Sequence, residues 1–540
     1  MRLDSHARVA STVVAFGPPM SMIRHRFGGN LRAVRVSVLR RRPPRTADPR
    51  LRFFDRLGRL EGDRASDSGG TRGPDRMTEQ EAPTEVDRGH PDDGERGGTC
   101  MKFRKLGALA GVSLLVLSAC SSAPAASTAP TGGASGSALQ PSSAQPAGDS
   151  SKGKITIAIE LPQQGSEKAA SDPIINGVKL AVKLAGGTAG GYAIDIPQSA
   201  LYDDALNGAH DPQTGANNMS KIVADQNVVA VIGPLNSSVA KAQIPISNAG
   251  GVLQCSPANT NQDLTQGAPA KQLRTKPNNY IRVVTTDNVQ GPAAAQYIYD
   301  VLGKKSVYVI DDTETFGKGV ADAFAAEFTK RGGKVVKHDG APKTTQDYVS
   351  IMTAAKALTP ESIYFGGVTA TGGARILLAA QQVGLGDVPF VGPDGINDGS
   401  GETKDSFLNL GAAAAKNSYS TLAGIGDFPG RAQFEVDYKA AYNTSPTGYA
   451  GTGFACAQVV IDALNRAGKT SPANLGALRE AVRAAGTATD VSYTTIVGKI
   501  TFDANGDTSQ KIVSIYSVDP AAANGKGDWK FETQVDYAAK

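Results

Sequence analysis

Three polar residues, Ser237, Thr260 and Asp394, lie in segments that follow predicted strands, where side chains are commonly free to bind a ligand. Ser237 lies in a Gly-Pro-Leu-Asn-Ser-Ser segment, between a predicted strand at 228–233 and a predicted helix from about 238. A hydroxyl and free backbone N–H groups at a helix N-terminus favour binding of a carboxylate. Thr260 follows a second apolar strand, and Asp394 lies in a Gly-Pro-Asp-Gly turn. Taken singly, the three also fit the structural roles of a helix cap, a turn residue and a turn acid.

The residue sets that usually perform catalysis are not found in the sequence after residue 120. This part holds only two histidines, His210 and His338, without a His-x-x-x-His or Gly-x-Ser-x-Gly motif. The acid pairs Asp203-Asp204 and Asp311-Asp312 consist of adjacent residues, which point to opposite faces at a strand end. The sequence therefore predicts no enzyme, no metal site and no cofactor.

The positive net charge of the chain, +5, comes from its front. Residues 1–100 contain 19 Arg and no Lys and show no sustained apolar period, so we interpret them as an upstream mis-annotated or disordered segment. From residue 120 onward, acidic residues slightly outnumber basic ones. This part has no basic surplus to neutralise phosphates, which argues against nucleic-acid binding.

A second start is visible at Met101. Basic residues come first, followed by an apolar run at 106–117 and by the segment Leu-Ser-Ala-Cys that ends at Cys120. The order resembles a bacterial lipoprotein signal, and the run is too short for an ordinary membrane span. It predicts a signal peptide at 101–119, lipid attachment at Cys120 and an extracytoplasmic protein held at the cell membrane by its N-terminal lipid. The alternative is a buried core cysteine.

The segment 120–153 consists almost entirely of Ser, Ala, Pro, Gly and Thr. Such a composition cannot bury enough apolar surface to offset its chain entropy, so it predicts a flexible tether. The part beyond the tether holds two cysteines, Cys255 and Cys456, and the sequence leaves open whether they pair.

Short β-branched runs alternate with longer amphipathic ones from residue 154 onward, which is typical of βαβ units with parallel strands. Strands are predicted at 154–160, 228–233, 306–311, 334–338, 362–366 and 389–392. Helices are predicted at about 173–185, 212–225, 290–302, 316–331, 346–357 and 370–383. Residues 154–540 are too many for a single core, so two α/β lobes are expected.

Several stretches resemble the leucine/isoleucine/valine-binding proteins, which are type I periplasmic binding proteins. They are 201–204 (LYDD), 232–238 (IGPLNSS), 256–265 (SPANTNQDLT), 280–292 ending in DNVQGP, 316–319 (FGKG) and 390–396 (FVGPDGI). The resemblance covers about 154–520 and implies two lobes, each a parallel sheet flanked by helices, with interlobe crossovers near 285–287, 421 and 501–507. Lobe 1 would then comprise 154–286 and 422–501, and lobe 2 would comprise 287–421 and 502–540.

The resemblance also implies an amino-acid site. Ser237 would face the ligand carboxylate, the Ala258 carbonyl and Thr260 would share its head group, and Asp394 would reach the ammonium from the other lobe. Many relatives carry a longer Glu at the position of Asp394. Asn236 and Ala205 stand where some relatives carry cysteines, so the disulfide of those relatives is not expected here.

The side-chain pocket departs from the family. Phe316 keeps an apolar face, whereas Val368 and the region of Ala170 lack aromatic rings that the family carries. The loss of these rings predicts room for a ligand larger than leucine, or for one with its own ring.

The resulting hypothesis is a monomeric solute-binding lipoprotein that delivers an amino acid, of branched-chain type or related, to an ABC permease with its ATPase subunits. Two alternatives are a ligand-sensing lipoprotein for signalling and a binder of another small solute, such as an amide or an aromatic acid.

Overall fold

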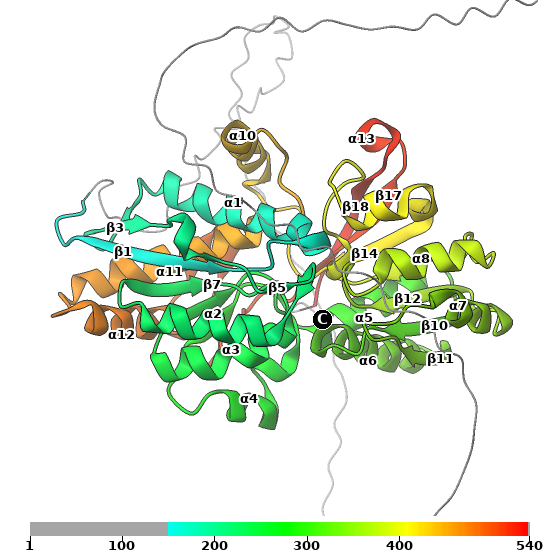
Figure 1. The fold of residues 1–540 in the computed structure, drawn as a ribbon, viewed down its shortest axis with the longest axis horizontal. Coiled ribbons are helices and arrows are strands. Elements are labelled where there is room, and N and C mark those ends of the chain that lie inside the picture. The colour runs from blue at the N-terminus through cyan, green and yellow to red at the C-terminus, as the bar shows by residue number, and fades with distance from the viewer. Residues whose placement is uncertain (1–148, 538–540) are drawn as a thin grey trace, which may run out of the picture. The chain divides into compact units, whose positions relative to one another are not determined.

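The computed structural model describes residues 149–537. These residues form two α/β lobes, each built around one sheet (Figure 1). The predicted upstream segment, the signal peptide with Cys120 and nearly all of the predicted tether lie outside the described residues. Among the helices of residues 149–537, none is both long and apolar enough to cross a membrane.

The sheet of the first lobe has the order β2-β3-β1-β7-β8-β9, with β4 pairing at the end of β1. Its strands are β1 (Lys154–Glu160), β2 (Thr188–Ala189), β3 (Tyr192–Asp195), β4 (Leu201–Tyr202), β7 (Val228–Ile232), β8 (Leu253–Ser256) and β9 (Tyr280–Arg282). The central strands are buried along nearly their whole length because helices cover both faces of the sheet. This explains why they read as nearly continuous apolar runs.

Alternate residues of β1 face the two helical layers of this lobe. Ile155, Ile157 and Ile159 pack in the core that contains α1 (Lys168–Leu184) and α11 (Ala450–Lys469), whereas Ala158 packs in the core that contains α2 (Pro212–Ala224). Figure 1 shows α1 and α11 on one face of the sheet and α2 and α3 (Ser237–Gly250) on the other.

The sheet of the second lobe has the order β11-β10-β12-β13-β14-β17-β18. Its strands are β10 (Ser306–Asp311), β11 (Lys334–Gly340), β12 (Ser362–Gly366), β13 (Phe390–Gly392), β14 (Ser418–Leu422), β17 (Ile512–Asp519) and β18 (Asp528–Asp536). The helices are α5 (Asp287–Gln296) and α6 (Thr315–Lys330) on one face and α7 (Tyr348–Ala357) and α8 (Gly373–Gln382) on the other.

The predicted fold, with a largely parallel sheet flanked by helices in each lobe, is confirmed, and antiparallel strands are added at the edges of both sheets. β2 and β3 form an antiparallel hairpin, and β17 runs antiparallel to both β14 and β18. Antiparallel neighbours need only a short turn, and Gly190 and Gly191, both at positive φ, make the turn between β2 and β3. The predicted alternation of strands and helices could not reveal these antiparallel pairs.

Most predicted elements occur within one to three residues of their expected bounds, but α1 was predicted wrongly at its start. The prediction placed its start at about residue 173. The helix begins at Lys168 and contains Pro173 in its second turn. The predicted helix from 290 also begins earlier, at Asp287, and continues beyond Gln296 as a π-helical turn.

The chain passes between the two sheets three times within residues 149–537. It leaves β9 at Arg282 for α5, returns after β14, and leaves the hairpin of β15 (Tyr493–Thr495) and β16 (Gly498–Ile500) for β17. The buried Arg282 Nε lies 2.7 Å from Oδ1 of Asp507, so an ion pair joins the first and third passages.

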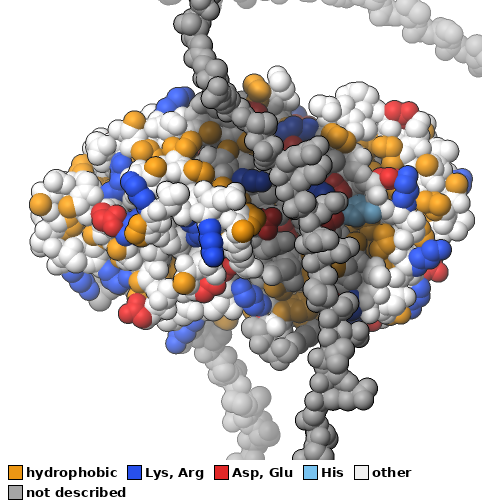
Figure 2. All heavy atoms as spheres, turned by 90° about the horizontal axis from the view of Figure 1, so that it is seen from below, with side chains coloured by type: hydrophobic (Ala, Val, Ile, Leu, Met, Phe, Trp, Pro, Cys, Tyr) orange, Lys and Arg blue, Asp and Glu red, His pale blue; other side chains and the backbone are white. Residues whose placement is uncertain are grey.

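Cys255 and Cys456 form a disulfide, which settles the question that the sequence left open. It links β8 to α11, and both cysteines are fully buried. The bond therefore lies within the core of the first lobe. Figure 2 shows basic and acidic side chains interspersed on the visible face of the described residues.

Candidate functional site

A cavity of about 40 Å³ is lined by residues of both lobes. The lining residues are Glu167, Ala170, Leu235, Asn236, Ser237, Ala258, Phe316, Val368, Thr369, Asp394, Gly395, Asn397, Asp398, Thr447, Gly448 and Tyr449. Six of the seven ligand-binding residues predicted from the sequence are therefore brought to one cavity: Ser237, Ala258, Asp394, Phe316, Asn236 and Val368.

The wall from the first lobe includes the N-terminus of α3. Ser237 is the first residue of this helix and Asn236 is its N-cap, directly after the loop that follows β7. The first backbone N–H groups of a helix have no partner within it and carry a partial positive charge. This edge of the cavity is suited to an anionic group such as a carboxylate.

Thr260 is the predicted residue that does not line the cavity. It is fully buried, and its backbone carbonyl accepts a hydrogen bond of 2.8 Å from the N–H of Asp287. Thr260 thus ties the loop after β8 to the start of α5, at the first passage between the lobes.

Asp394 lines the cavity from the second lobe, in the turn after β13. The side-chain amide of Gln290 donates a hydrogen bond to its Oδ1, and the Tyr449 hydroxyl also bonds to its carboxyl group. Burial raises the pKa of Asp394 to about 6, although both hydrogen bonds favour the ionised form and lower it. A cationic partner would complete this arrangement.

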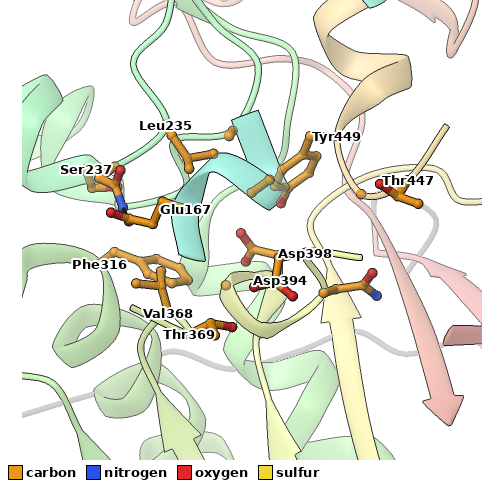
Figure 3. Close-up of a pocket in the computed structure, with 16 residues that line it drawn as sticks. Glu167, Leu235, Ser237, Phe316, Val368, Thr369, Asp394, Asp398, Thr447 and Tyr449 are labelled. Carbon is orange, nitrogen blue, oxygen red and sulfur yellow. Dashed lines mark hydrogen bonds between the residues drawn. The ribbon is translucent and has the colours of Figure 1, made fainter. Parts of the chain in front are cut away.

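The apolar part of the cavity is formed by Phe316, Val368, Leu235 and Ala170. Figure 3 shows the Phe316 ring beside Val368, with the Asp394 and Asp398 carboxyl groups and Tyr449 around the same space. Phe316, Val320 and Val368 form one small buried cluster. The wall thus combines hydrocarbon surface with a few polar groups, as ligand sites usually do.

Sequence reasoning missed Glu167, which lines the cavity and is paired with His210. Glu167 Oε1 makes two short contacts. It lies 2.8 Å from His210 Nδ1 and accepts a hydrogen bond of 2.7 Å from Asn236 Nδ2. The His210 ion pair lowers the pKa of Glu167 against the opposing effect of burial, and Glu167 raises the pKa of His210 to about 10. The pair is therefore ionised at neutral pH.

Tyr449, Asn397 and Asp398 were also missed. Tyr449 immediately precedes α11, in a segment without a local motif. Asn397 and Asp398 follow Asp394 closely, in a stretch that reads as a polar turn. The periodicity of the sequence carries no signal for any of these three residues.

No group of three or more His, Cys, Asp or Glu residues in the described chain is arranged to hold a metal ion. Both histidines within residues 149–537 have carboxylate partners: His210 pairs with Glu167, and His338 Nε2 lies 2.7 Å from Oδ2 of Asp311.

Residues 154–526 match the sequence profile of the family described as periplasmic binding protein. Because the match spans more than half of the chain, the protein belongs to this family. The resemblance inferred from the sequence is thus confirmed, and members of the family are solute-binding proteins.

Three similar proteins illustrate the relationship. The Leu/Ile/Val-binding protein BraC3 of Rhizobium johnstonii is 29% identical over 366 residues, which cover 67% of this chain and 91% of the relative. The crystal structure of a leucine-binding protein, LivK, of Thermotoga maritima has 25% identity and a TM-score of 0.60, and covers 72% of this chain and 100% of its own.

The third is a solute-binding protein of an ABC transporter from Rhodopseudomonas palustris, in complex with 3,4-dihydroxybenzoic acid. It has 18% identity and a TM-score of 0.57, and covers 71% of this chain and 97% of its own. This likeness supports the two-lobed type I fold.

Proposed function

We propose that the protein captures an amino acid between its two lobes and delivers it to the membrane permease of an ABC importer. The observation that carries the proposal is the position of Ser237 and Asp394. They line one cavity from opposite lobes, one at a helix N-terminus and the other as a half-buried carboxylate side chain.

An amino acid carries one anionic and one cationic group on the same carbon. The N-terminus of α3 supplies N–H groups and the Ser237 hydroxyl for the carboxylate, and Asp394 supplies an acceptor for the ammonium group. Because the two partners belong to different lobes, a ligand that contacts both stabilises the closed form relative to the open form. Capture and closure are then one event.

In the cell, the protein would act as a monomeric lipoprotein that is held at the membrane through Cys120. Its partners would be the permease and ATPase subunits of the importer. Family membership and the names of its relatives support the transport role. The protein itself performs no catalysis in this proposal, since ATP hydrolysis belongs to the partner subunits.

A thermal-shift screen of the mature chain against amino acids, amides, aromatic acids and short peptides tests the binding function. A ligand that binds only the folded state raises the melting temperature. We expect an α-amino acid to stabilise the protein and Asp394→Asn to lose that response. If only another class of solute raises the melting temperature, the amino-acid assignment is wrong.

Uptake distinguishes delivery from sensing. Deletion of the gene should abolish uptake of the labelled ligand, and re-expression of the wild type, but not of Asp394→Asn, should restore it. Normal uptake with a lost transcriptional or behavioural response would instead support the sensing alternative.

A further inference from the structure

The cavity contains more negative charge than one amino-acid ammonium group requires. Asp398 lines it four residues after Asp394 and is only 4% exposed. No Lys, Arg or His side chain is among the described residues that line the cavity. Burial raises the pKa of Asp398 to about 7, with smaller opposing contributions from the Phe407 backbone and from Thr369.

Glu167 is the third carboxylate that lines the cavity, and it is not available to bind a ligand cation. Glu167 is already matched by His210 in a buried ion pair. Asp394, by contrast, contacts the neutral groups of Gln290 and Tyr449. Asp394 and Asp398 are therefore the two acidic side chains of the cavity wall that lack a cationic partner within that wall.

Two neutral polar atoms of the cavity wall also lack partners, one an acceptor and the other a donor. Oδ1 of Asn236 and Nδ2 of Asn397 are buried without a hydrogen-bond partner in the described structure, and both residues line the cavity. A buried polar atom is costly unless it is hydrogen-bonded. Asn236 Oδ1 can accept from an N–H group, and Asn397 Nδ2 can donate to a carboxylate or carbonyl oxygen.

A purely hydrocarbon side chain would suit Phe316, Val368 and Leu235 but would leave Asp398 facing apolar atoms. A side chain with a methylene stem and a charged end suits both kinds of wall, because the stem packs on apolar surface while the head reaches a polar partner.

Resting on the proposed function, we propose that the ligand is an amino acid with a second cationic group in its side chain, and that Asp398 recognises this group. Asp394 takes the α-ammonium and Asp398 takes the side-chain ammonium or guanidinium. Asp398 is thus a specificity-determining residue.

Isothermal titration with matched ligands tests the ligand class. Lysine, ornithine and arginine would be compared with norleucine, which keeps the lysine stem without its amine, and with leucine and 4-hydroxybenzoate. We expect the tightest basic amino acid to bind at least tenfold more tightly than norleucine. Equal or tighter binding of norleucine or leucine would overturn the inference while leaving the proposed function intact.

Asp398→Asn tests the residue without removing its structural contact. Oδ1 of Asp398 accepts a hydrogen bond of 2.9 Å from the N–H of Phe407, and an Asn side-chain oxygen can accept the same bond. The variant should lose at least tenfold in affinity for the basic amino acid and less than threefold for norleucine. Asp347→Asn, at a carboxyl that accepts from Ser350 N at the start of α7 and lies outside the cavity, is the matched control.

Proton release separates recognition from a structural role. A cation that binds next to a partly protonated carboxyl group displaces its proton, so titration near pH 7 in buffers of different ionisation enthalpy should show proton release on binding. Asp398→Asn should lose most of this release, whereas Asp347→Asn should keep it. Unchanged release and selectivity in Asp398→Asn would show that Asp398 only holds Phe407. Failure of every amino acid to bind would contradict the proposed function itself.

Discussion

Nδ1 of His210 lies 2.8 Å from Oε1 of Glu167, and neither side chain is more than 3% exposed. The backbone N–H of His210 donates to the other oxygen of Glu167. Across the cleft, Lys343 Nζ donates to the His210 carbonyl at 3.2 Å and lies 3.3 Å from Oε1 of Glu314. A buried ion pair of the first lobe thus meets an ion pair of the second lobe beside the cavity.

The substitution His210→Asn should destabilise the protein by about 3 kcal/mol at pH 7, because it leaves the Glu167 carboxylate buried without its cation. Urea unfolding measures the loss. His338→Asn is the control, since the His338 side chain is 26% exposed and the loss should stay below about 1 kcal/mol.

The pH dependence of this difference has a defined direction. The pKa of His210 is raised from 6.5 to about 10 in the folded protein, so its stabilising contribution is complete below about pH 6.5 and is lost as the pH rises towards 10. The gap between the wild type and His210→Asn should shrink over that window. A gap that widens from pH 7 to pH 10 would contradict the assignment.

Asp394→Asn should affect binding and stability in opposite directions. The pKa of Asp394 is raised to about 6, so at pH 7 folding must keep an ionised group in an unfavourable environment. Removing that charge should stabilise the ligand-free protein by about 1 kcal/mol, while ligand affinity falls at least a hundredfold. Calorimetric melting without ligand and titration with ligand measure the two effects, and loss of both stability and binding would indicate a structural role instead.

The sequence predicts the strands of both lobes well because burial on both faces leaves continuous apolar runs such as Val228–Ile232. It also indicates Ser237 and Asp394, since each follows such a run at the carboxyl end of a strand. Ion pairs such as Arg282 with Asp507 are different. The two residues are 225 positions apart and meet only after the third passage between the lobes. No local sequence pattern predicts the contact between Arg282 and Asp507.

Arg282 is the next residue whose role is testable. It is fully buried, and its guanidinium donates to the carbonyls of Asn259 and Asn261, at 3.2 and 2.7 Å, as well as to Asp507. Arg282→Met should cost about 3 kcal/mol and should weaken ligand binding, because the loop after Ala258 loses its support.

A double-mutant cycle with Asp507→Leu isolates the ion pair. The double variant should be more stable than Arg282→Met alone, since it no longer buries an unpaired carboxylate. Strict additivity of the two single losses in urea unfolding would show that the pair is not coupled.

Val368 tests the size of the cavity. It packs against Phe316 and lines the apolar wall, so Val368→Phe adds a ring where the family resemblance implies that one has been lost. Affinity for large amino acids should fall at least tenfold relative to alanine in competition titrations. Val436→Phe, at a side chain that is 62% exposed, should leave the preference unchanged. An unchanged preference in Val368→Phe would place the ligand side chain elsewhere.

Glu160, at the end of β1, is fully buried and interacts with the buried carboxyl group of Asp204. Burial raises its pKa from 4.5 to about 8, so the favourable contribution of its protonated form is complete below pH 4.5 and is lost as the pH rises towards 8. Glu160→Gln keeps the shape and removes this titration.

The variant should therefore lose less stability than the wild type between pH 5 and pH 8, and should be more stable at pH 8 by about 2 kcal/mol. Urea unfolding at both pH values measures the slope. The exposed Glu402→Gln serves as control and should follow the wild type. A wild-type slope retained in Glu160→Gln would assign the titration to Asp204 alone, whose pKa is also raised by burial and by the neighbouring Glu160.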